Sequence, residues 1–374
     1  MKTEVLNLLD DKEYWNHIRR AAAVLEAGGL VAFPTETVYG LGASAAHPEA
    51  LRRLREVKER TEGKPFTLHI GRRSDIHQYV PRLSGLARRL TEKGWPGPLT
   101  VVFHVPDVQA APILDRLPNR DPSALYYNDT IGVRCPDLRA CEDLLRETKV
   151  PVVAPSANRA GEDPPVRASE VLQGLDGRIE LVLDGGTTRY AKPSTIVSVQ
   201  DDHLDFLRAG VYDERTVRRW STANYLFVCS GNTCRSPMAA GLFRKLLAER
   251  LGIREDQLEA RGYNVMSAGT FAGGGSSVSG AAVSVLRKRG IDISTHRSVP
   301  LTIDMIQAAD AIFAMSQSHV EAVVAMVPGA ASKTYLLDPA GDIDDPIGGP
   351  DSMYEDVAGR IEAALRARLE EITV

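Results

Sequence analysis

A cysteine, a second cysteine and an arginine stand close together in the second half of the chain, at Cys229, Cys234 and Arg235. The sequence around them reads Cys-Ser-Gly-Asn-Thr-Cys-Arg-Ser-Pro. Backbone amides of a tight loop that runs into a helix converge on one point and form an anion site. A thiol at the base of such a site, beside a guanidinium, is expected to react as a thiolate. The stretch therefore predicts a nucleophile, Cys229, aimed at a phosphoryl group that Arg235 grips.

The flanking residues predict the elements that hold this loop. The apolar run Tyr225–Val228 reads as a buried strand, and residues 238–247 have the apolar period of a helix. Ser236 suits the N-cap of that helix and Pro237 its first position. A bare Cys-x5-Arg spacing also arises from a strand-ending cysteine and a surface arginine, but strand, turn and helix signals together favour a phosphate loop.

From Asn224 to its end the chain resembles the low-molecular-weight protein phosphatases. The resemblance rests on the loop 229–237, on Ser267-Ala268-Gly269-Thr270, on the strand 310–316 and on Asp345-Pro346. It implies that Cys229 and Arg235 are catalytic and that Asp345 is the general acid. It also implies that the remaining loop residues surround the phosphoryl oxygens, namely Ser230, Gly231, Asn232, Thr233, Cys234 and Ser236.

Two positions bear on the substrate of this half. Asp345-Pro346 is followed by Ile347-Gly348-Gly349, whereas tyrosine-directed members usually carry aromatic residues after the Asp-Pro. Thr233 is polar where those members tend to be aliphatic. The combination resembles the protein-arginine phosphatase branch and implies phosphoarginine in proteins as the substrate. Phosphotyrosine is the alternative, in which Thr233 merely packs against the loop.

Two further interpretations of the cysteines concern redox chemistry. Cys229 and Cys234 lie in one loop, and a disulfide between them would make this half a redox sensor. Arsenate reductases share the fold but need resolving cysteines beyond the loop, and no cysteine follows Cys234. The second interpretation is therefore disfavoured.

In the first half, polar residues follow apolar runs in the manner of ligand loops. Residues 30–33 read as a short buried strand, and Pro34–Gly42 adds two threonines, a carboxylate and glycines directly after it. Lys58–Pro65 forms a basic loop of a kind that binds polyphosphates, although most charge clusters are solvated surface. His69 alternates with apolar neighbours, as a core histidine also would.

These pieces resemble the YrdC-like threonylcarbamoyl-AMP synthase family between about residues 30 and 211. The matching elements, in chain order, are Pro34–Gly42, Lys58-x-Arg60 with Lys64-Pro65, His69, Pro96-Gly97-Pro98, Arg134, Ser156-Ala157-Asn158, Ser194-Thr195 and Arg208-Ala209-Gly210. Each is weak alone, and the ordered set is specific. Thr61 departs from the family, which often has proline there, and this puts the rigidity of the basic loop in question.

The resemblance implies that L-threonine, bicarbonate and ATP condense to threonylcarbamoyl-AMP with release of pyrophosphate. The adenylate would feed the tRNA-modification machinery that makes threonylcarbamoyladenosine. The implied ATP-binding residues are Lys58, Arg60, Arg134, Ser156, Asn158, Ser194 and Arg208, and the implied threonine-binding residues are Thr35 and His69. Mg2+ is expected with ATP, and no residue is assigned as a metal ligand.

An RNA-binding module is the rival interpretation of the first half. The cations at Arg52, Arg53, Arg55, Lys58, Arg60, Lys64, Arg72 and Arg73 would then line a positive groove. Binding of single strands usually adds aromatic side chains on which bases stack, and none are interleaved with these cations. A steep salt dependence of RNA binding, without pyrophosphate release, would favour this alternative.

Length, net charge and cysteine content limit the class of protein to which both halves can belong. With 374 residues there is room for two domains, and the formal net charge of -4 gives no general attraction to nucleic acid or an anionic membrane. Four cysteines make no disulfide framework, which fits a reducing cytoplasm, and no apolar run suits a membrane span.

We expect a synthase-like domain at 1–212, a linker at 213–223 and a phosphatase domain at 224–374. Both should be α/β, first a twisted mixed sheet with helices and then a parallel sheet wrapped by helices.

Overall fold

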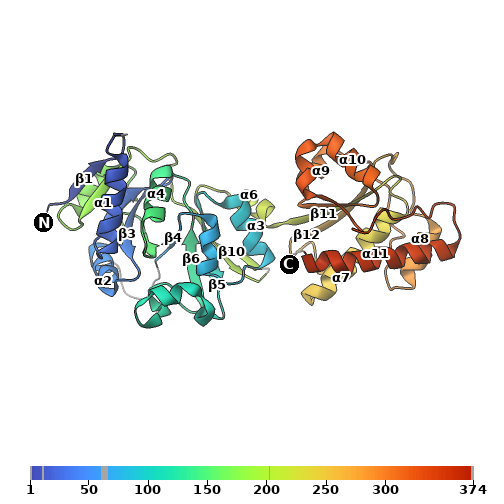
Figure 1. Ribbon diagram of the computed structural model, residues 1–374, viewed down its shortest axis with the longest axis horizontal. Helices are drawn as coiled ribbons and strands as arrows, with labels where there is room; N and C mark the ends of the chain where they lie inside the picture. Colours follow the sequence, from blue (N-terminus) through green and yellow to red (C-terminus); the bar gives the residue numbers. More distant parts are fainter. Residues whose placement is uncertain (1, 11, 60–65, 202, 372–374) are drawn as a thin grey trace. The chain divides into compact units, whose positions relative to one another are not determined.

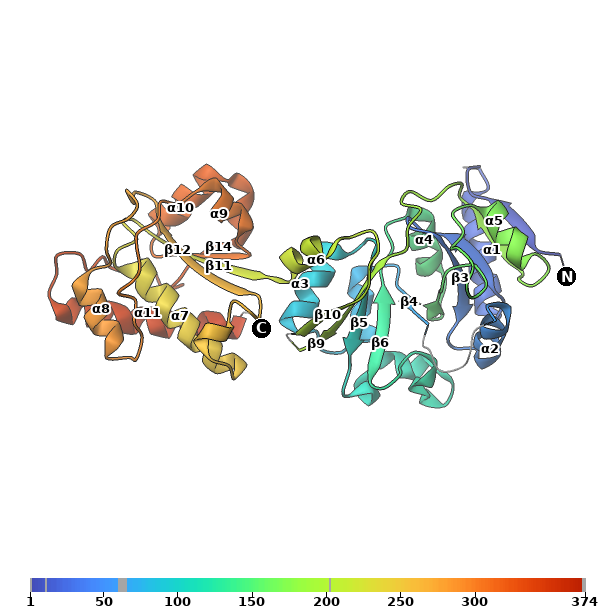
Figure 2. The same cartoon turned by 180° about the vertical axis from the view of Figure 1, so that it is seen from behind.

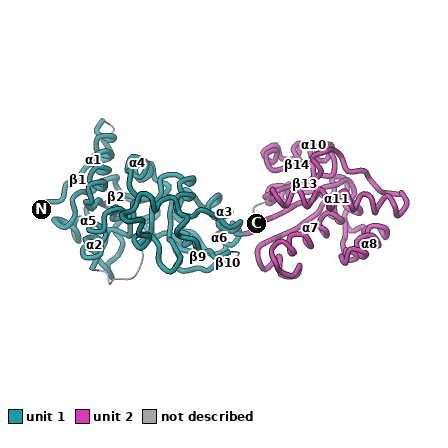
Figure 3. Tube along the Cα trace, turned by 60° about the horizontal axis from the view of Figure 1, so that its bottom comes forward, with its two compact units in different colours: residues 1–221 teal, residues 222–374 magenta. Residues whose placement is uncertain are grey.

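A computed structural model describes residues 2–10, 12–59, 66–201 and 203–371. The chain divides into two compact units, residues 1–221 and 222–374 (Figure 3). Each unit has its own sheet and its own apolar core. Residues 214–221, which lie in the predicted linker, form a short helix that packs on the first unit: Val217 is buried in that unit's core and Trp220 packs against it.

The first unit is built on a ten-stranded mixed sheet with the order β1-β8-β2-β3-β7-β4-β6-β5-β9-β10. Its strands are β1 (Glu4–Asn7), β2 (Val31–Pro34), β3 (Tyr39–Ser44), β4 (Leu68–His69), β5 (Leu99–His104), β6 (Thr130–Arg134), β7 (Val152–Val153), β8 (Leu181–Asp184), β9 (Thr195–Gln200) and β10 (His203–Arg208). Its α-helices are α1 (Tyr14–Glu26), α2 (Pro48–Val57), α3 (Gly85–Gly94), α4 (Arg139–Glu147), α5 (Ala168–Leu175) and α6 (Glu214–Ser221). Short 3-10 helices are η1 (Arg73–Gln78), η2 (Val108–Ala110), η3 (Pro112–Arg116), η4 (Pro118–Arg120) and η5 (Pro122–Ala124).

Apolar patterning explains how this sheet is covered. β2 and β3 are buried along their whole length and pair antiparallel, so the short connection between them holds residues 35–38 at one edge of the pair. Helices α1 and α4 lie side by side across one face of the sheet (Figure 1), with Ile18 and Leu25 of α1 and Leu144 of α4 fully buried. Helices α3 and α6 lie together near β9 and β10 (Figures 1 and 2).

One glycine of the first unit is required by a close approach of two chain segments. A Cβ built on Gly210 would lie 2.3 Å from the carbonyl carbon of Ser194 and 2.2 Å from the amide nitrogen of Thr195. Only glycine fits there, and its fit brings the end of β10, with Arg208, against the residues that open β9.

The second unit is a four-stranded parallel sheet with the order β12-β11-β13-β14. Its strands are β11 (Ala223–Cys229), β12 (Tyr263–Gly269), β13 (Ala311–Ala314) and β14 (Thr334–Leu336). Its helices are α7 (Arg235–Leu251), α8 (Gly280–Arg287), α9 (Ile303–Ala308), α10 (Gln317–Met326) and α11 (Asp351–Glu371), with 3-10 helices η6 (Glu255–Gln257) and η7 (Pro328–Lys333).

Alternate residues of β11 supply the two faces of this sheet. Tyr225 and Phe227 join the core under α7, α8 and α11, whereas Leu226 and Val228 join the core under α9 and α10. Helices therefore cover both faces (Figure 1). The predicted architecture, a twisted mixed sheet followed by a helix-wrapped parallel sheet, is confirmed in both units. Among the described helices, none is long and apolar enough to cross a bilayer.

Candidate functional sites

The predicted phosphate loop joins the carboxyl end of β11 to the start of α7. The helix begins at Arg235, so the prediction of Ser236 as N-cap and Pro237 as first helical residue is wrong by two positions. The reason lies in the Ser236 hydroxyl, which caps no backbone amide of the helix and instead lies 3.0 Å from Cys229 Sγ. The Ser236 hydroxyl therefore contacts the Cys229 thiol and does not cap the helix.

Asn232 holds the loop in its curled shape. Its φ of +54° lies in the left-handed region, which asparagine tolerates better than most residues, and its backbone N–H lies 3.2 Å from Cys229 Sγ. Its side-chain amide donates to the hydroxyls of Ser236, at 2.8 Å, and Ser267, at 2.9 Å, while its amide oxygen accepts from the N–H of Val299 at 2.8 Å. A fully buried asparagine with these partners fixes the loop around the thiol.

Arg235 and Asp345 meet at this loop although 110 positions separate them. The guanidinium forms an ion pair with the Asp345 carboxylate and donates to the carbonyl of Ile343 at 3.0 Å. The Arg235 side chain is 7% exposed, whereas that of Asp345 is 41% exposed. The predicted nucleophile, guanidinium and general acid are thus brought together, with the acid on the solvent side.

His319 belongs to this site and was not predicted. Its Nε2 lies 2.9 Å from Ser230 Oγ, and its Nδ1 lies 2.6 Å from Ser316 Oγ. Burial, chiefly, and the nearby Arg235 guanidinium lower the pKa of His319 to about 4, so it is neutral at pH 7. The loop hydroxyl it contacts lies 3.4 Å from an Arg235 nitrogen. No spacing in the sequence joins a loop serine to a helix residue 89 positions away.

The surroundings of Thr233 and Cys234 complete the loop. Thr233 is half-buried, and its carbonyl accepts from the Ser279 amide at 2.9 Å. Cys234 is buried, with Sγ 3.5 Å from the Tyr354 hydroxyl. Phe271, which is 87% exposed, follows the loop's neighbour strand and donates its amide to the Ser230 carbonyl at 3.0 Å. This exposed aromatic residue beside the loop was also missed.

The predicted synthase residues lie around two adjoining hollows of the first unit. The smaller hollow, about 100 Å³, is lined by Thr35, His69, Arg134, Ser156, Ser194 and Arg208 among others. The larger hollow, about 660 Å³, is lined by Lys58, Ser156, Asn158 and Arg208 among others. Arg60 lies outside the described residues. Tyr39, Thr67 and Thr100 also line the smaller hollow and were absent from the predicted site.

Arg134 is anchored beneath the smaller hollow by residues of the β2–β3 connection. One guanidinium nitrogen donates to Glu36 Oε1 and to Thr37 Oγ1, both at 2.7 Å. The side chains of this ion pair are 6% and 0% exposed. Arg134 Nε and Glu36 Oε2 have no hydrogen-bond partner in the described part of the chain. The pair therefore keeps a donor and an acceptor free within a buried setting, where unpaired polar atoms are costly.

Lys58 ties the end of α2 to the Ser156–Asn158 loop. Its ammonium donates to the carbonyl oxygens of Ser156, at 2.5 Å, and Asn158, at 2.6 Å. Asn158 in turn donates from its side chain to the Glu162 carbonyl at 2.7 Å, and its own Oδ1 is buried without a partner among the described residues. The lysine therefore orders the predicted nucleotide loop as well as supplying charge.

Arg208, Ser194 and Thr100 form a second polar cluster. Arg208 donates to the carbonyl and hydroxyl oxygens of Ser194 at 2.9 and 3.1 Å, and the Ser194 hydroxyl lies 2.9 Å from that of Thr100. Burial, with a smaller contribution from Arg134, lowers the pKa of Arg208 below its ordinary value. Two guanidinium groups thus face one hollow, an arrangement that suits a polyanion.

The two predicted threonine-binding residues lie at the same hollow. Thr35 is buried, and its hydroxyl donates to the Val38 carbonyl at 2.7 Å. His69 Nδ1 lies 3.2 Å from the Thr67 carbonyl. Burial, chiefly, and Arg134 lower the pKa of His69 to about 3, so the ring is neutral at physiological pH. A neutral imidazole offers both a donor and an acceptor.

The residues around the hollows give only limited support to a metal ion. Within the described ranges no cluster of three histidine, cysteine or acidic residues has the arrangement of a metal site. The acids nearby are Glu59, which lines the larger hollow, and Glu36, whose free oxygen is buried. Mg2+ usually takes one or two carboxylates plus substrate phosphates, so any such ion here would be carried mainly by the phosphates.

Comparison with known proteins separates the two units. The Sua5/YciO/YrdC profile, described as "Telomere recombination", matches residues 23–210, and the "Low molecular weight phosphotyrosine protein phosphatase" profile matches residues 224–373. A threonylcarbamoyl-AMP synthase of Bacillus subtilis is 38% identical over 52% of this chain, which spans only 53% of that relative's length. A protein-arginine-phosphatase of Geobacillus stearothermophilus is 37% identical over 39% of this chain and 94% of its own. A variant of Pyrococcus abyssi Sua5 with two alanine substitutions superposes with a TM-score of 0.51 at 23% identity, covering 89% of this chain and 98% of its own, a likeness of fold alone.

Proposed function

Because the chain belongs to the Sua5/YciO/YrdC family in its first unit and to the low-molecular-weight phosphatase family in its second, we propose that it is a bifunctional enzyme. The first unit makes threonylcarbamoyl-AMP from L-threonine, bicarbonate and ATP. The second unit removes phosphoryl groups from arginine side chains of proteins. A cytoplasmic location fits both, because ATP, threonine, tRNA and phosphoproteins are found there together.

The observation that carries the synthase proposal is the convergence of eight predicted residues on two adjoining hollows. ATP occupies the larger hollow, where the Ser156–Asn158 loop contacts the nucleotide and the unpaired Asn158 Oδ1 accepts from it. Arg134 and Arg208 stabilise the charge that develops as pyrophosphate leaves. Threonine lies against Thr35 and His69 in the smaller hollow. Any Mg2+ would be held mainly by the phosphates of ATP, where it would offset their charge. The adenylate then passes to the tRNA-modifying machinery.

Pyrophosphate release tests this assignment. The purified chain should release pyrophosphate from ATP only when threonine and bicarbonate are both present. Lys58→Ala and Arg60→Ala should each nearly abolish release, since charge on the transferring phosphates is then left without its partner. Lys12→Ala is the matched control, because Lys12 is exposed and lines neither hollow. This variant should leave pyrophosphate release unchanged. Unaltered turnover in both site variants would overturn the assignment.

The observation that carries the phosphatase proposal is the buried Cys229 thiol with Arg235 and Asp345 at the same loop. Cys229 attacks phosphorus while Arg235 and the loop amides hold the oxygens, and Asp345 protonates the departing nitrogen. Water then attacks the phosphocysteine, with Asp345 taking its proton, and inorganic phosphate leaves with the thiolate restored. The acid must release Arg235 or share it with the substrate, because the two are paired in the free chain.

The choice of phosphoarginine rests on Thr233 and on the residues after the acid. Ile347, which is 69% exposed, and two glycines stand after Asp345-Pro346, so no aromatic pair sandwiches a phenyl ring there. The Thr233 hydroxyl can accept from a guanidinium N–H, and the relative of 37% identity is named a protein-arginine-phosphatase.

Matched peptides test the choice. A phosphoarginine peptide should be hydrolysed faster than a phosphotyrosine peptide of the same sequence. Thr233→Ile should narrow or reverse that ratio, while Thr233→Ser, which keeps the hydroxyl, should preserve it. Equal or faster hydrolysis of the phosphotyrosine peptide by the unaltered chain would contradict the phosphoarginine assignment and identify the second unit as a tyrosine phosphatase.

A further inference from the structure

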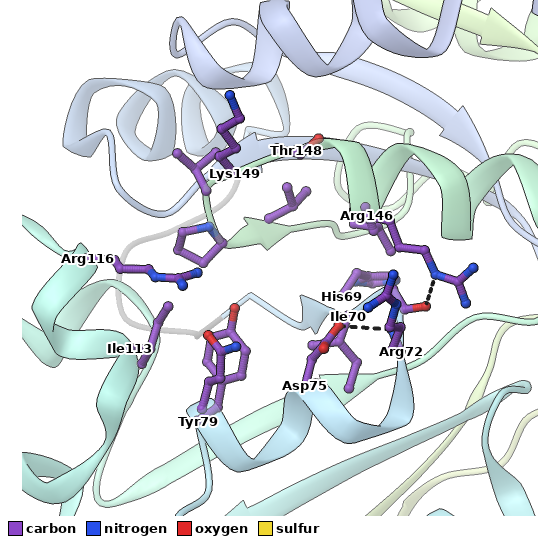
Figure 4. Close-up of a pocket in the computed structure, with 16 residues that line it drawn as sticks. His69, Ile70, Arg72, Asp75, Tyr79, Ile113, Arg116, Arg146, Thr148 and Lys149 are labelled. Atoms are coloured by element: carbon purple, nitrogen blue, oxygen red, sulfur yellow. Dashed lines mark hydrogen bonds between the residues drawn. The ribbon is translucent and has the colours of Figure 1, made fainter. Parts of the chain in front are cut away.

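A third hollow in the first unit is separate from the two assigned to ATP and threonine. It measures about 210 Å³ and lies beyond the end of β4, between η1, η3 and the segment that follows α4 (Figure 4). Of the predicted site residues that the structure describes, only His69 lines it, and His69 also lines the smaller hollow. We call it the basic hollow, because the described residues that line it include Arg72, Arg116, Arg146 and Lys149 but only one acid, Asp75.

The charges of the basic hollow are unevenly satisfied. Arg146 is engaged, since its Nε donates to the Gly71 carbonyl at 3.1 Å and it pairs with Glu142 at 3.1 Å. Asp75 accepts from the backbone N–H of Arg72 at 3.0 Å. Among the described residues, Arg72 and Arg116 form no ion pair, and Figure 4 shows them on opposite sides of the hollow. Lys149 extends from the rim away from the centre (Figure 4).

Tyr79 provides an independent sign of a ligand. Its side chain comes up from η1 into the hollow (Figure 4), and the residue is only 7% exposed. Within the described residues its hydroxyl has no hydrogen-bond partner, although its backbone carbonyl accepts from Tyr126 at 2.7 Å. Burial, chiefly, raises the pKa of Tyr79, so the hydroxyl remains a donor at neutral pH. The hydroxyl thus stands at the wall of the hollow as a donor that no described acceptor occupies, and it is available to an anionic ligand.

The size of the hollow limits what it can hold. A volume of about 210 Å³ is several times the roughly 30 Å³ of one water but falls below the ~300–1,000 Å³ of pockets for drug-sized ligands. Guanidinium groups match the geometry of phosphate oxygens and grip two at once. We propose that the basic hollow binds a compact, multiply charged oxyanion of the phosphate type, held between Arg72 and Arg116 with the Tyr79 hydroxyl donating to it.

Calorimetric titration of pyrophosphate into the full-length chain tests the proposal. The ATP hollow is first saturated with a non-hydrolysable ATP analogue, and Arg235→Ala weakens anion binding at the phosphate loop. Pyrophosphate should still bind. Adding Arg72→Ala or Arg116→Ala should weaken this binding about tenfold or more, and Tyr79→Phe, which keeps the ring, should weaken it severalfold. Because every variant shares one background, anion binding elsewhere cancels in the comparison.

Two neighbouring arginines are matched controls. Arg73 donates to the Glu92 carbonyl and Arg120 is paired with Asp115, and neither lines the hollow. Arg73→Ala and Arg120→Ala should leave the affinity unchanged, and thermal melts confirm that all variants fold. Parallel titrations of phosphate and ADP tell a free ion from the phosphate tail of a nucleotide. Absence of binding in the shared background would overturn the proposal. Equal weakening of pyrophosphate binding by the site and control variants would also overturn it.

Discussion

The two proposed active sites are assembled in opposite ways. The phosphate loop is a continuous stretch from Cys229 to Ser236, and its internal hydrogen bonds fix its own shape. The two adjoining hollows of the first unit collect side chains from segments between Thr35 and Arg208, each carried by a different part of the sheet. A continuous loop can hold its geometry through local contacts, whereas a dispersed site holds it only while the whole sheet is in place.

The arginines of the two sites show the same difference. Arg235 pairs with an acid that is 41% exposed and able to move toward a substrate. Arg134 pairs with Glu36, whose side chain is fully buried, and donates a second hydrogen bond to the Thr37 hydroxyl. The first pairing can exchange during a reaction cycle, while the second is part of the architecture. Substitutions should therefore separate activity from stability in the second unit and couple them in the first.

The largest expected effect is the loss of one activity alone. Cys229→Ser should lower phosphatase turnover by at least about 1,000-fold, because loss of a nucleophile removes the covalent route. Pyrophosphate release by the first unit should not change, and neither should the unfolding transition. Both activities are measured on the same preparation. Concurrent loss of pyrophosphate release would show that the units do not act independently.

Breaking the buried ion pair should couple activity to stability in the first unit. Glu36→Ala leaves the Arg134 charge buried without its partner, which costs about 3–5 kcal/mol of unfolding free energy. Urea unfolding measures this loss of unfolding free energy. The rate of pyrophosphate release should fall in the same variant.

Controls for this substitution come from the same unit. Glu49→Ala, which removes a surface ion pair with Arg52, should show no measurable change. The double variant Glu36→Leu with Arg134→Met should regain stability but not activity, since both charges are gone. A stable Glu36→Ala variant would contradict the architectural role given to this pair.

Sequence reasoning predicted the continuous site more completely than the dispersed one. Cys229, Arg235 and the helix after them are adjacent in the chain, so strand, turn and helix signals are sufficient. Asp345 came only from family resemblance, and the contact of Ser230 with His319 was invisible because it joins residues 89 positions apart. The start of α7 was misplaced because the capping preference of Ser236 was overridden by its contact with Cys229.

For the first unit the same limits applied over longer distances. The predicted residues do converge on the hollows, but the pairing of Arg134 with Glu36 bridges 98 positions. The anchoring of Lys58 by two backbone carbonyls has no signature in side-chain types. The segment 213–223 was assigned to the linker because charged residues dominate it, yet helix α6 within it docks on the first unit through Val217 and Trp220.

Lowering the pH should destabilise the first unit through its buried histidine, His69. His69 has a pKa of about 3 when folded and an ordinary value near 6.5 when unfolded, so the unfolded chain takes up its proton first as pH falls. The stability from the neutral ring is thus present above pH 6.5 and is lost progressively toward pH 3, by about 2 kcal/mol between pH 7 and pH 5.

Urea unfolding at the two pH values measures this loss. His69→Asn should flatten the pH dependence, while His77→Asn, at an exposed histidine, should not. His319 of the second unit, with a pKa lowered to about 4, should act in the same direction over a narrower range. Equal pH dependence with and without His69 would mean that its ring is not the buried neutral group described here.

The smallest expected effect distinguishes the thiols of the two units. Burial, chiefly, raises the pKa of Cys135 to about 12 and that of Cys141 well above its usual value, so both should resist oxidation. In the second unit peroxide should convert Cys229 to a sulfenic acid, and the Cys234 thiol should then displace water from it to form a disulfide. Thiol treatment should restore the phosphatase, because the disulfide blocks further oxidation.

Cys234→Ser tests this protection directly. The variant should stay active, because the serine can keep the contact with the Tyr354 hydroxyl. After a peroxide pulse it should regain less than about half of its activity with thiol, since its sulfenic acid oxidises further to forms that thiols do not reduce. Cys141→Ser is the matched control and should recover like the unaltered chain. If Cys234→Ser recovers equally well, Cys234 only packs against Tyr354 and the continuous site has no built-in protection. Mass spectrometry of the oxidised chain then decides the comparison, since a disulfide should appear between Cys229 and Cys234 while Cys135 and Cys141 stay reduced.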